Sequence, residues 1–113
     1  MKPKTATFDD LLAQGASAVI NHLPEHSFYV SIIRNITKAC DCEADAGEII
    51  AGDVGILFSD NPVAIDTASI DLINEASGGK NVFMDANHKD PMLQVDFAAK
   101  YTGKSKDYQL EII

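Results

Sequence analysis

Two cysteines separated by a single aspartate, Cys40-Asp41-Cys42, are the residues of this chain whose spacing points most directly to chemistry. They are the only cysteines in the sequence. Two thiolates this close can bind one soft metal ion, such as zinc or copper(I), or an iron of an iron–sulfur cluster. A structural zinc site needs four ligands, and a typical cluster needs four cysteines. The pair therefore indicates a zinc or iron–sulfur cofactor with incomplete ligands in this chain, or else a structural or incidental pair of thiols.

Histidine and carboxylate groups elsewhere in the chain could supply the missing ligands, because both bind zinc in proteins. The acidic residues that follow the cysteines could also bind a hard cation, but their glycine and glutamate positions do not match an EF-hand loop. The predicted metal site comprises Cys40, Cys42, Asp41, Asp53, Asp60, Asp66 and His88. The alternative for the carboxylates and the histidine is a set of capping and solvated surface groups.

The segment from Ser59 to Asp66 joins an expected strand to an expected helix. Ligands of open α/β sheets bind at strand ends of this kind, and a helix N-terminus can receive an anion. Asp60 and Asp66 flank this helix start, so a fragment of an enzyme that uses carboxylates is one hypothesis. Helix capping and a surface carboxylate are the alternative, and whether the chain is an enzyme stays open.

Length and charge limit the function classes. The chain has 113 residues, which fits a single domain over residues 1–113. A net charge of −8 argues against nucleic acid and against anionic membranes as partners. No apolar run approaches the roughly 20 residues of a membrane span, and the first residues lack the apolar core of a secretory signal. We therefore expect a cytoplasmic setting, where thiols stay reduced.

Apolar periodicity predicts the first half of the fold. A helix is expected from Thr7 to the stop at Pro24, because apolar residues recur there at helical spacing. Its predicted buried face comprises Phe8, Leu11, Leu12, Gly15, Val19 and Leu23. Residues 27–33 and 54–58 read as strands that are apolar on both faces, which is typical of central strands. A loop of about twenty residues, 34–53, is expected between them, and it contains the cysteines.

Capping signals predict the second half. Asn61-Pro62 is a strong helix start and Gly78-Gly79 a stop, and Asp90-Pro91 and Gly103 repeat these signals. The tail 108–113 reads as a closing strand. The expected fold class is α/β: a small sheet of about three strands, mainly central, with helices packed against it.

Four segments together resemble a known family. They are Cys40-Asp41-Cys42, residues 53–57, residues 59–68 with their Pro62-Val63-Ala64-Ile65-Asp66, and the ending 105–112. Over roughly residues 27–113 they look like the C-terminal part of the Domain of Unknown Function 362 family, which is commonly described as iron–sulfur-centre proteins. The resemblance implies a longer parent protein, and many relatives carry a ferredoxin-like cysteine cluster that this chain lacks.

Three functions follow as hypotheses. The first is a metal- or iron–sulfur-associated domain whose activity is not established, with the Cys-x-Cys loop as its site. The second is a non-catalytic interaction or regulatory domain of a larger assembly, whose surface is covered by a missing domain, a partner chain or a second copy. The third is the enzyme fragment that uses aspartate carboxylates.

Overall fold

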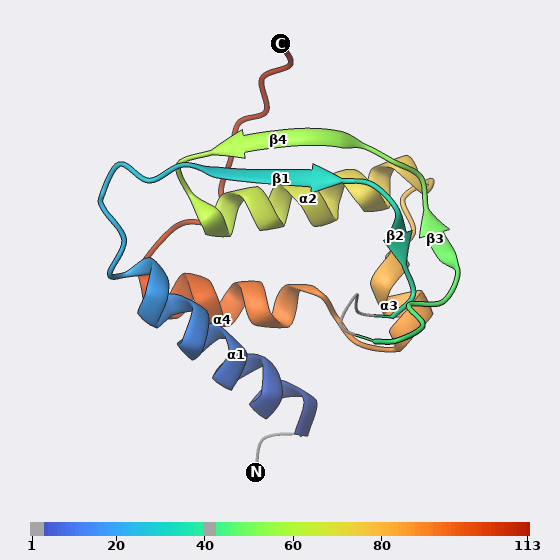
Figure 1. The fold of residues 1–113 in the computed structure, drawn as a ribbon, viewed down its shortest axis with the longest axis horizontal. Coiled ribbons are helices and arrows are strands. Elements are labelled where there is room, and N and C mark those ends of the chain that lie inside the picture. The colour runs from blue at the N-terminus through green and yellow to red at the C-terminus, as the bar shows by residue number, and fades with distance from the viewer. Residues whose placement is uncertain (1–3, 40–42) are drawn as a thin grey trace.

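The computed structural model describes residues 4–39 and 43–113 (Figure 1). Helices flank the strands along this part of the chain. The elements are α1 (Lys4–Ile20), β1 (Tyr29–Ile33), β2 (Ile36–Thr37), β3 (Ile49–Ala51), β4 (Gly55–Ser59), α2 (Pro62–Ala76), α3 (Val82–Asn87) and α4 (Met92–Thr102). The mixed α/β class is confirmed. Within the described residues the strands form two antiparallel two-stranded sheets, β1–β4 and β2–β3, in place of one sheet of about three strands.

The two sheets form one bent ribbon. β1 pairs with β4 from Tyr29↔Ser59 to Ile33↔Gly55, and β2 continues from β1 as β4 continues from β3. At the bend, Asn35 adopts a left-handed conformation with a φ of 51°. Asp53 stabilises it, because its Oδ1 accepts a hydrogen bond from the Asn35 amide at 2.9 Å. The bend turns the β2–β3 sheet away from the plane of β1–β4 (Figure 1).

The predicted twenty-residue loop between the strands is wrong, because most of it belongs to this ribbon. Backbone pairing extends beyond β2: the Lys38 amide donates to the Glu48 carbonyl at 3.0 Å, and the Ala39 amide donates to the Ala46 carbonyl at 2.8 Å. Strands of two and three residues are too short to show a period of two, so the sequence pattern missed them.

Helix α2 is the central element. Asn61 caps it, as predicted, with its Oδ1 accepting from the Val63 amide at 3.0 Å and the Ala64 amide at 3.1 Å. One side of α2 packs against the inner face of β1–β4 and another side packs against α4. Two small apolar clusters result: one contains Ile33, Ala51, Ile73 and Val82, and the other contains Val63, Ile70 and Val95.

The predicted helix after Asp90-Pro91 is confirmed as α4. Asp90 Oδ1 accepts from the Met92 amide at 2.9 Å, and Gly103 ends the helix with a φ of 70°. The six-residue helix α3 was not predicted. It starts at Asn81, whose side chain accepts from the Met84 amide at 3.3 Å. Six residues are fewer than two helical turns, so they carry little periodic signal.

The predicted buried face of α1 is wrong. Phe8, Leu11 and Val19 are 59%, 62% and 62% exposed. The helix buries its opposite face instead, which carries Asp9, Asp10, Ala13 and Ser17. This face packs on α4, so the layers run from the β1–β4 sheet through α2 and α4 to α1 (Figure 1). Small and polar residues fit here because α4 and the segment before it supply a phenol and an ammonium group to the two carboxylates.

The prediction that residues 27–33 and 54–58 are central strands is also wrong. In the part of the chain that the structure describes, β1 and β4 pair only with each other, and one face of their sheet is exposed. The tail 108–113 forms no strand; Tyr108 Oη donates to Asp71 Oδ2 at 2.7 Å and fixes its start against α2. Among the described residues, no helix is both long and apolar enough to cross a membrane.

Candidate functional site

A cleft of about 530 Å³ lies where the start of α1, β2, α2 and the α3–α4 connection meet. We call it the polar cleft. Its charged lining residues are Asp9, Lys38, Asp66, Lys89 and Asp90. Ser69 and Asn87 add a hydroxyl and an amide, while Ile70, Ile73 and Phe83 form its apolar floor. A cleft with convergent polar groups over an apolar floor is the usual form of a ligand site.

An ion pair between a half-buried lysine and a buried aspartate lines the polar cleft. The Lys89 Nζ lies 3.1 Å from Asp9 Oδ2, and the two side chains are 31% and 4% exposed. The contact lacks hydrogen-bond alignment at that oxygen, so its attraction is mainly electrostatic. Lys89 Nζ also lies 4.7 Å above the centre of the Phe8 ring. The pair ties α1 to the α3–α4 connection, because a buried carboxylate needs a cation nearby.

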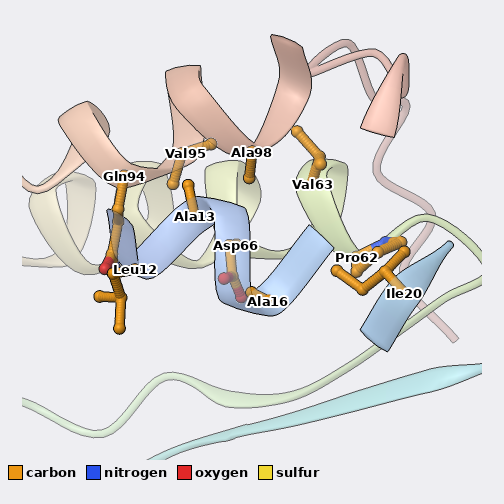
Figure 2. A pocket seen from close by; sticks show the side chains of 10 residues that line it. All are labelled: Leu12, Ala13, Ala16, Ile20, Pro62, Val63, Asp66, Gln94, Val95 and Ala98. Atoms are coloured by element: carbon orange, nitrogen blue, oxygen red, sulfur yellow. The ribbon is translucent and has the colours of Figure 1, made fainter. Parts of the chain in front are cut away.

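Asp66 lies on the other wall, one turn into α2. It lines the polar cleft and also a smaller apolar cleft of about 140 Å³ between α1, α2 and α4. Figure 2 shows its carboxylate beside Ala16 of α1, with Val95 and Ala98 on α4 across the cleft. Asp66 is an exposed residue by its surface area, but the walls of the two clefts partly desolvate its carboxyl, and this burial raises its pKa above the usual value. Asp66 therefore exchanges a proton at higher pH than a free aspartate does.

The other predicted ligands among the described residues do not join Asp66. Asp53 accepts the Asn35 hydrogen bond at the bend of the ribbon, and Asp60 is exposed after β4. His88 caps the C-terminal end of α3 with a φ of 56° and lines a separate cleft of about 540 Å³. In residues 4–39 and 43–113 there is no group of three histidine, cysteine or acidic side chains that could hold a metal ion.

Cys40, Asp41 and Cys42 lie outside the described residues. Their neighbour Ala39 is described: it lines the polar cleft and pairs with Ala46. The cysteine segment therefore follows directly from a residue at the edge of the cleft that Asp66 lines.

Sequence reasoning missed the other charged residues of the polar cleft. Lys89 and Asp90 follow His88 in the same polar turn, so the turn itself was the available signal. Asp9 gave a weaker signal, as one of two adjacent acids on a helix whose opposite face is apolar. Chemically, the cleft offers carboxylates to a cation and ammonium groups to an anion.

The comparisons with known proteins give one match. No curated protein and no solved structure matches the chain. A family model, described as Domain of unknown function (DUF362), matches residues 1–71. The match takes in α1, the whole ribbon and α2 as far as Asp71, and thus Cys40, Cys42 and Asp66, whereas His88 and the ending 105–112 lie beyond it. Because this model covers more than half of the sequence, the chain belongs to the DUF362 family.

Proposed function

We propose that this chain is a metal-associated DUF362 domain in which the Cys40 and Cys42 thiolates bind a soft metal ion and the polar cleft is the adjoining ligand site. One observation carries the proposal: Ala39, the residue before Cys40, lines the same cleft as Asp66. Two thiols that follow in sequence from a residue of a cleft with a carboxylate are a reasonable place for metal chemistry.

The donor set limits which metal fits. One copy of the chain has two thiols, and the described residues contain no metal-type cluster that could complete a site by itself. Zinc accepts mixed cysteine and carboxylate ligands, so two thiolates with Asp66 and one further donor would suit it. An iron–sulfur cluster with four cysteines does not fit one copy and would need thiolates from another chain. Zinc is therefore the first metal to test.

The test is a metal titration of the reduced chain. Co²⁺ serves as a spectroscopic substitute for zinc, and competition with a chelator then gives the zinc affinity. We expect stoichiometric binding, with thiolate-to-cobalt absorption that the double variant Cys40→Ser/Cys42→Ser lacks. Ala44→Ser is the matched control, because it changes the same connection and keeps both thiols. Equal metal content in wild type and double variant refutes the proposal.

A parallel reconstitution with iron and sulfide separates the two cofactors. A cluster that forms only in an oligomer would assign the missing ligands to another chain, whereas zinc bound by a monomer would assign them to this chain. Asp66→Asn then reports whether Asp66 is one of them: a ligand role predicts a weaker zinc affinity with the cobalt–thiolate absorption retained.

A non-catalytic interaction domain is the second candidate. It is favoured by the apolar stripe of α1, which is exposed while the polar face of the helix is buried. An uncovered stripe of this size on a helix marks a surface for another protein segment. Two results would count against this candidate: a chain that stays monomeric and soluble at high concentration, and a Leu11→Lys variant whose association is the same as that of wild type.

A further inference from the structure

We infer that the outer face of the β1–β4 sheet is a dimer interface that packs against the same face of a second copy of this chain. The face is built from alternate residues of the two strands. Val30 pairs with Phe58 and Ile32 pairs with Ile56, so these four side chains form two neighbouring cross-strand pairs. Phe28 extends the row before β1. We call these five residues the outer patch.

The outer patch is apolar and uncovered. Its residues are 75%, 54%, 64%, 63% and 74% exposed, in the order Phe28, Val30, Ile32, Ile56 and Phe58. The opposite face of the sheet packs on α2, and no helix or strand of the described residues lies over the outer face (Figure 1). The C-terminal tail lies beside β4, where Leu110 and Ile112 line a cleft together with Ile56 and Phe58. An antiparallel sheet with one solvated face normally carries polar residues there, so the apolar pattern on this face predicts a covering layer.

The patch has the size that such a layer requires. A phenylalanine presents about 150–250 Å², so the two that are three-quarters exposed contribute roughly 220–370 Å² to the surface. With three branched aliphatic residues added, the patch reaches the upper end of what a monomer leaves exposed, about 300–600 Å². That is enough for the apolar core of an interface that buries about 800 Å² per partner, with the polar rim supplying the rest.

Charge favours a second copy as the occupant. Arg34 follows β1 directly and Asp60 follows β4 directly, so the antiparallel register places them at opposite ends of the sheet. Their positions continue the alternation of Ile32 and Phe58, which assigns them to the outer face, and both are exposed. A two-fold axis that lies in the interface perpendicular to the strands brings Arg34 of each copy to the end of the sheet where the other copy has Asp60, one strand away. The interface is then self-complementary, as a symmetric dimer requires.

The dimer also completes the architecture. The β1–β4 sheet has only two strands and packs on α2 on one side alone. Two such sheets packed face to face, about 10 Å apart, would bury both outer faces. Each copy would keep α2 on the far side of its sheet, and the polar cleft would remain outside the interface. This inference therefore does not depend on metal binding.

Sedimentation velocity over a concentration series at fixed salt tests the inference. Wild type is expected to be a dimer that dissociates on dilution. Ile56→Lys, in the patch, should raise the dissociation constant at least about 100-fold, because dimerisation would bury an unpaired charge. Ile49→Lys is the matched control: it makes the same change at an isoleucine that is equally exposed, 63% in both cases, but that lies in β3 of the other sheet. It should leave the dimer unchanged.

The exposed charges give a second test that does not alter the apolar patch. Arg34→Asp and Asp60→Arg should each weaken the dimer about tenfold or more, and the double variant should restore it to near wild type. A wild type that stays monomeric at all concentrations would overturn the inference. So would a dimer lost equally in Ile49→Lys, or charge swaps that do not compensate. Circular dichroism of each variant shows that the fold is retained.

Discussion

The orientation of α1 depends on a hydrogen bond between residues 91 positions apart, and its removal is the sharpest test of this fold. Tyr101 Oη donates to Asp10 Oδ1, and Asp10 is buried, with only 7% of its surface exposed. Gln14 Nε2 donates to the same oxygen at 3.1 Å and lies 3.4 Å from the phenol oxygen. These contacts fix the polar face of α1 on α4.

The perturbation is Tyr101→Phe, which removes one hydroxyl and keeps the ring. A hydrogen bond to a charged group is worth about 1.5–3 kcal/mol, and a carboxylate left short of a donor in a buried place loses most of that. Gln14 still donates to Asp10, so we expect a loss of about 1.5–2 kcal/mol, in the lower part of this range. Urea denaturation measures the free energy of unfolding, and amide hydrogen exchange of α1 shows where protection is lost.

Tyr108→Phe is the matched control, because it removes the same group from another tyrosine–aspartate pair. Tyr108 Oη donates to Asp71 Oδ2 at 2.7 Å, but this pair is exposed and water can replace the hydroxyl. Its loss should cost less than about 0.5 kcal/mol. The hydrogen bond to Asp71 also raises the pKa of Tyr108 above its usual value, so a tyrosine titration confirms that the control contact exists. Equal costs for the two variants, or unchanged exchange in α1, would refute the assigned role of the buried pair.

Three further variants test the cleft and the cap. Because burial raises the pKa of Asp66, the folded state binds its proton more tightly than the unfolded state does. This group therefore lowers the free energy of unfolding as pH rises from about 3.8 through the folded pKa. In urea titrations, Asp66→Asn should be more stable than wild type at pH 7, and the difference should vanish near pH 3. Asn61→Ala should cost about 1–2 kcal/mol by calorimetry, with Asn61→Asp losing far less, because Asn61 satisfies two amides at the start of α2. Lys89→Met should lower the free energy of unfolding in urea by about 1–3 kcal/mol, because it leaves Asp9 buried without its cation. Lys89→Arg should retain the pair. An unchanged free energy of unfolding in Lys89→Met would show that water already solvates Asp9.

Local chemistry explains which elements could be predicted from the sequence. Asn61-Pro62 and Asp90-Pro91 start helices because each combines a side-chain acceptor with a residue that has no amide proton to satisfy. Gly103 ends α4 because it adopts a left-handed conformation without strain. These signals act within a few residues of chain, so they need no tertiary information.

Tertiary contacts explain what could not be predicted. Periodicity showed that α1 is amphipathic, but not that residues around position 90 and position 101 would bind its carboxylates. The apolar alternation of β1 and β4 indicated two buried faces, whereas the described fold covers one. In the proposed dimer a second copy would cover the other face, and the local sequence pattern of one chain does not say which surface does so.

The same distinction applies to the candidate site. Asp53 was predicted as a ligand, but it satisfies the amide of Asn35 in a turn, a common use of aspartate near a positive φ. His88 likewise occupies a helix end. Asp66 differs because it sits inside α2, where the backbone amides are already paired, and its carboxylate is therefore available to the cleft. The ligand roles of Asp53 and His88 stay predictions, whereas Asp66 is the predicted residue that lines the polar cleft.

The burial of α1 links the two proposals. This helix uses two carboxylates and a serine for its intramolecular contact and leaves its leucines exposed, although burying the leucines would release more free energy from the hydrophobic effect. Helix α1 and the outer face of the β1–β4 sheet lie on opposite sides of the layers (Figure 1). The polar cleft is lined by other residues, among them Asp66 of α2 and Lys89 before α4. A chain arranged in this way can associate through either surface without covering its cleft. Loss of metal binding in the cysteine variant with the dimer intact, or loss of the dimer in Ile56→Lys with metal binding intact, would therefore assign each property to its own part of the molecule.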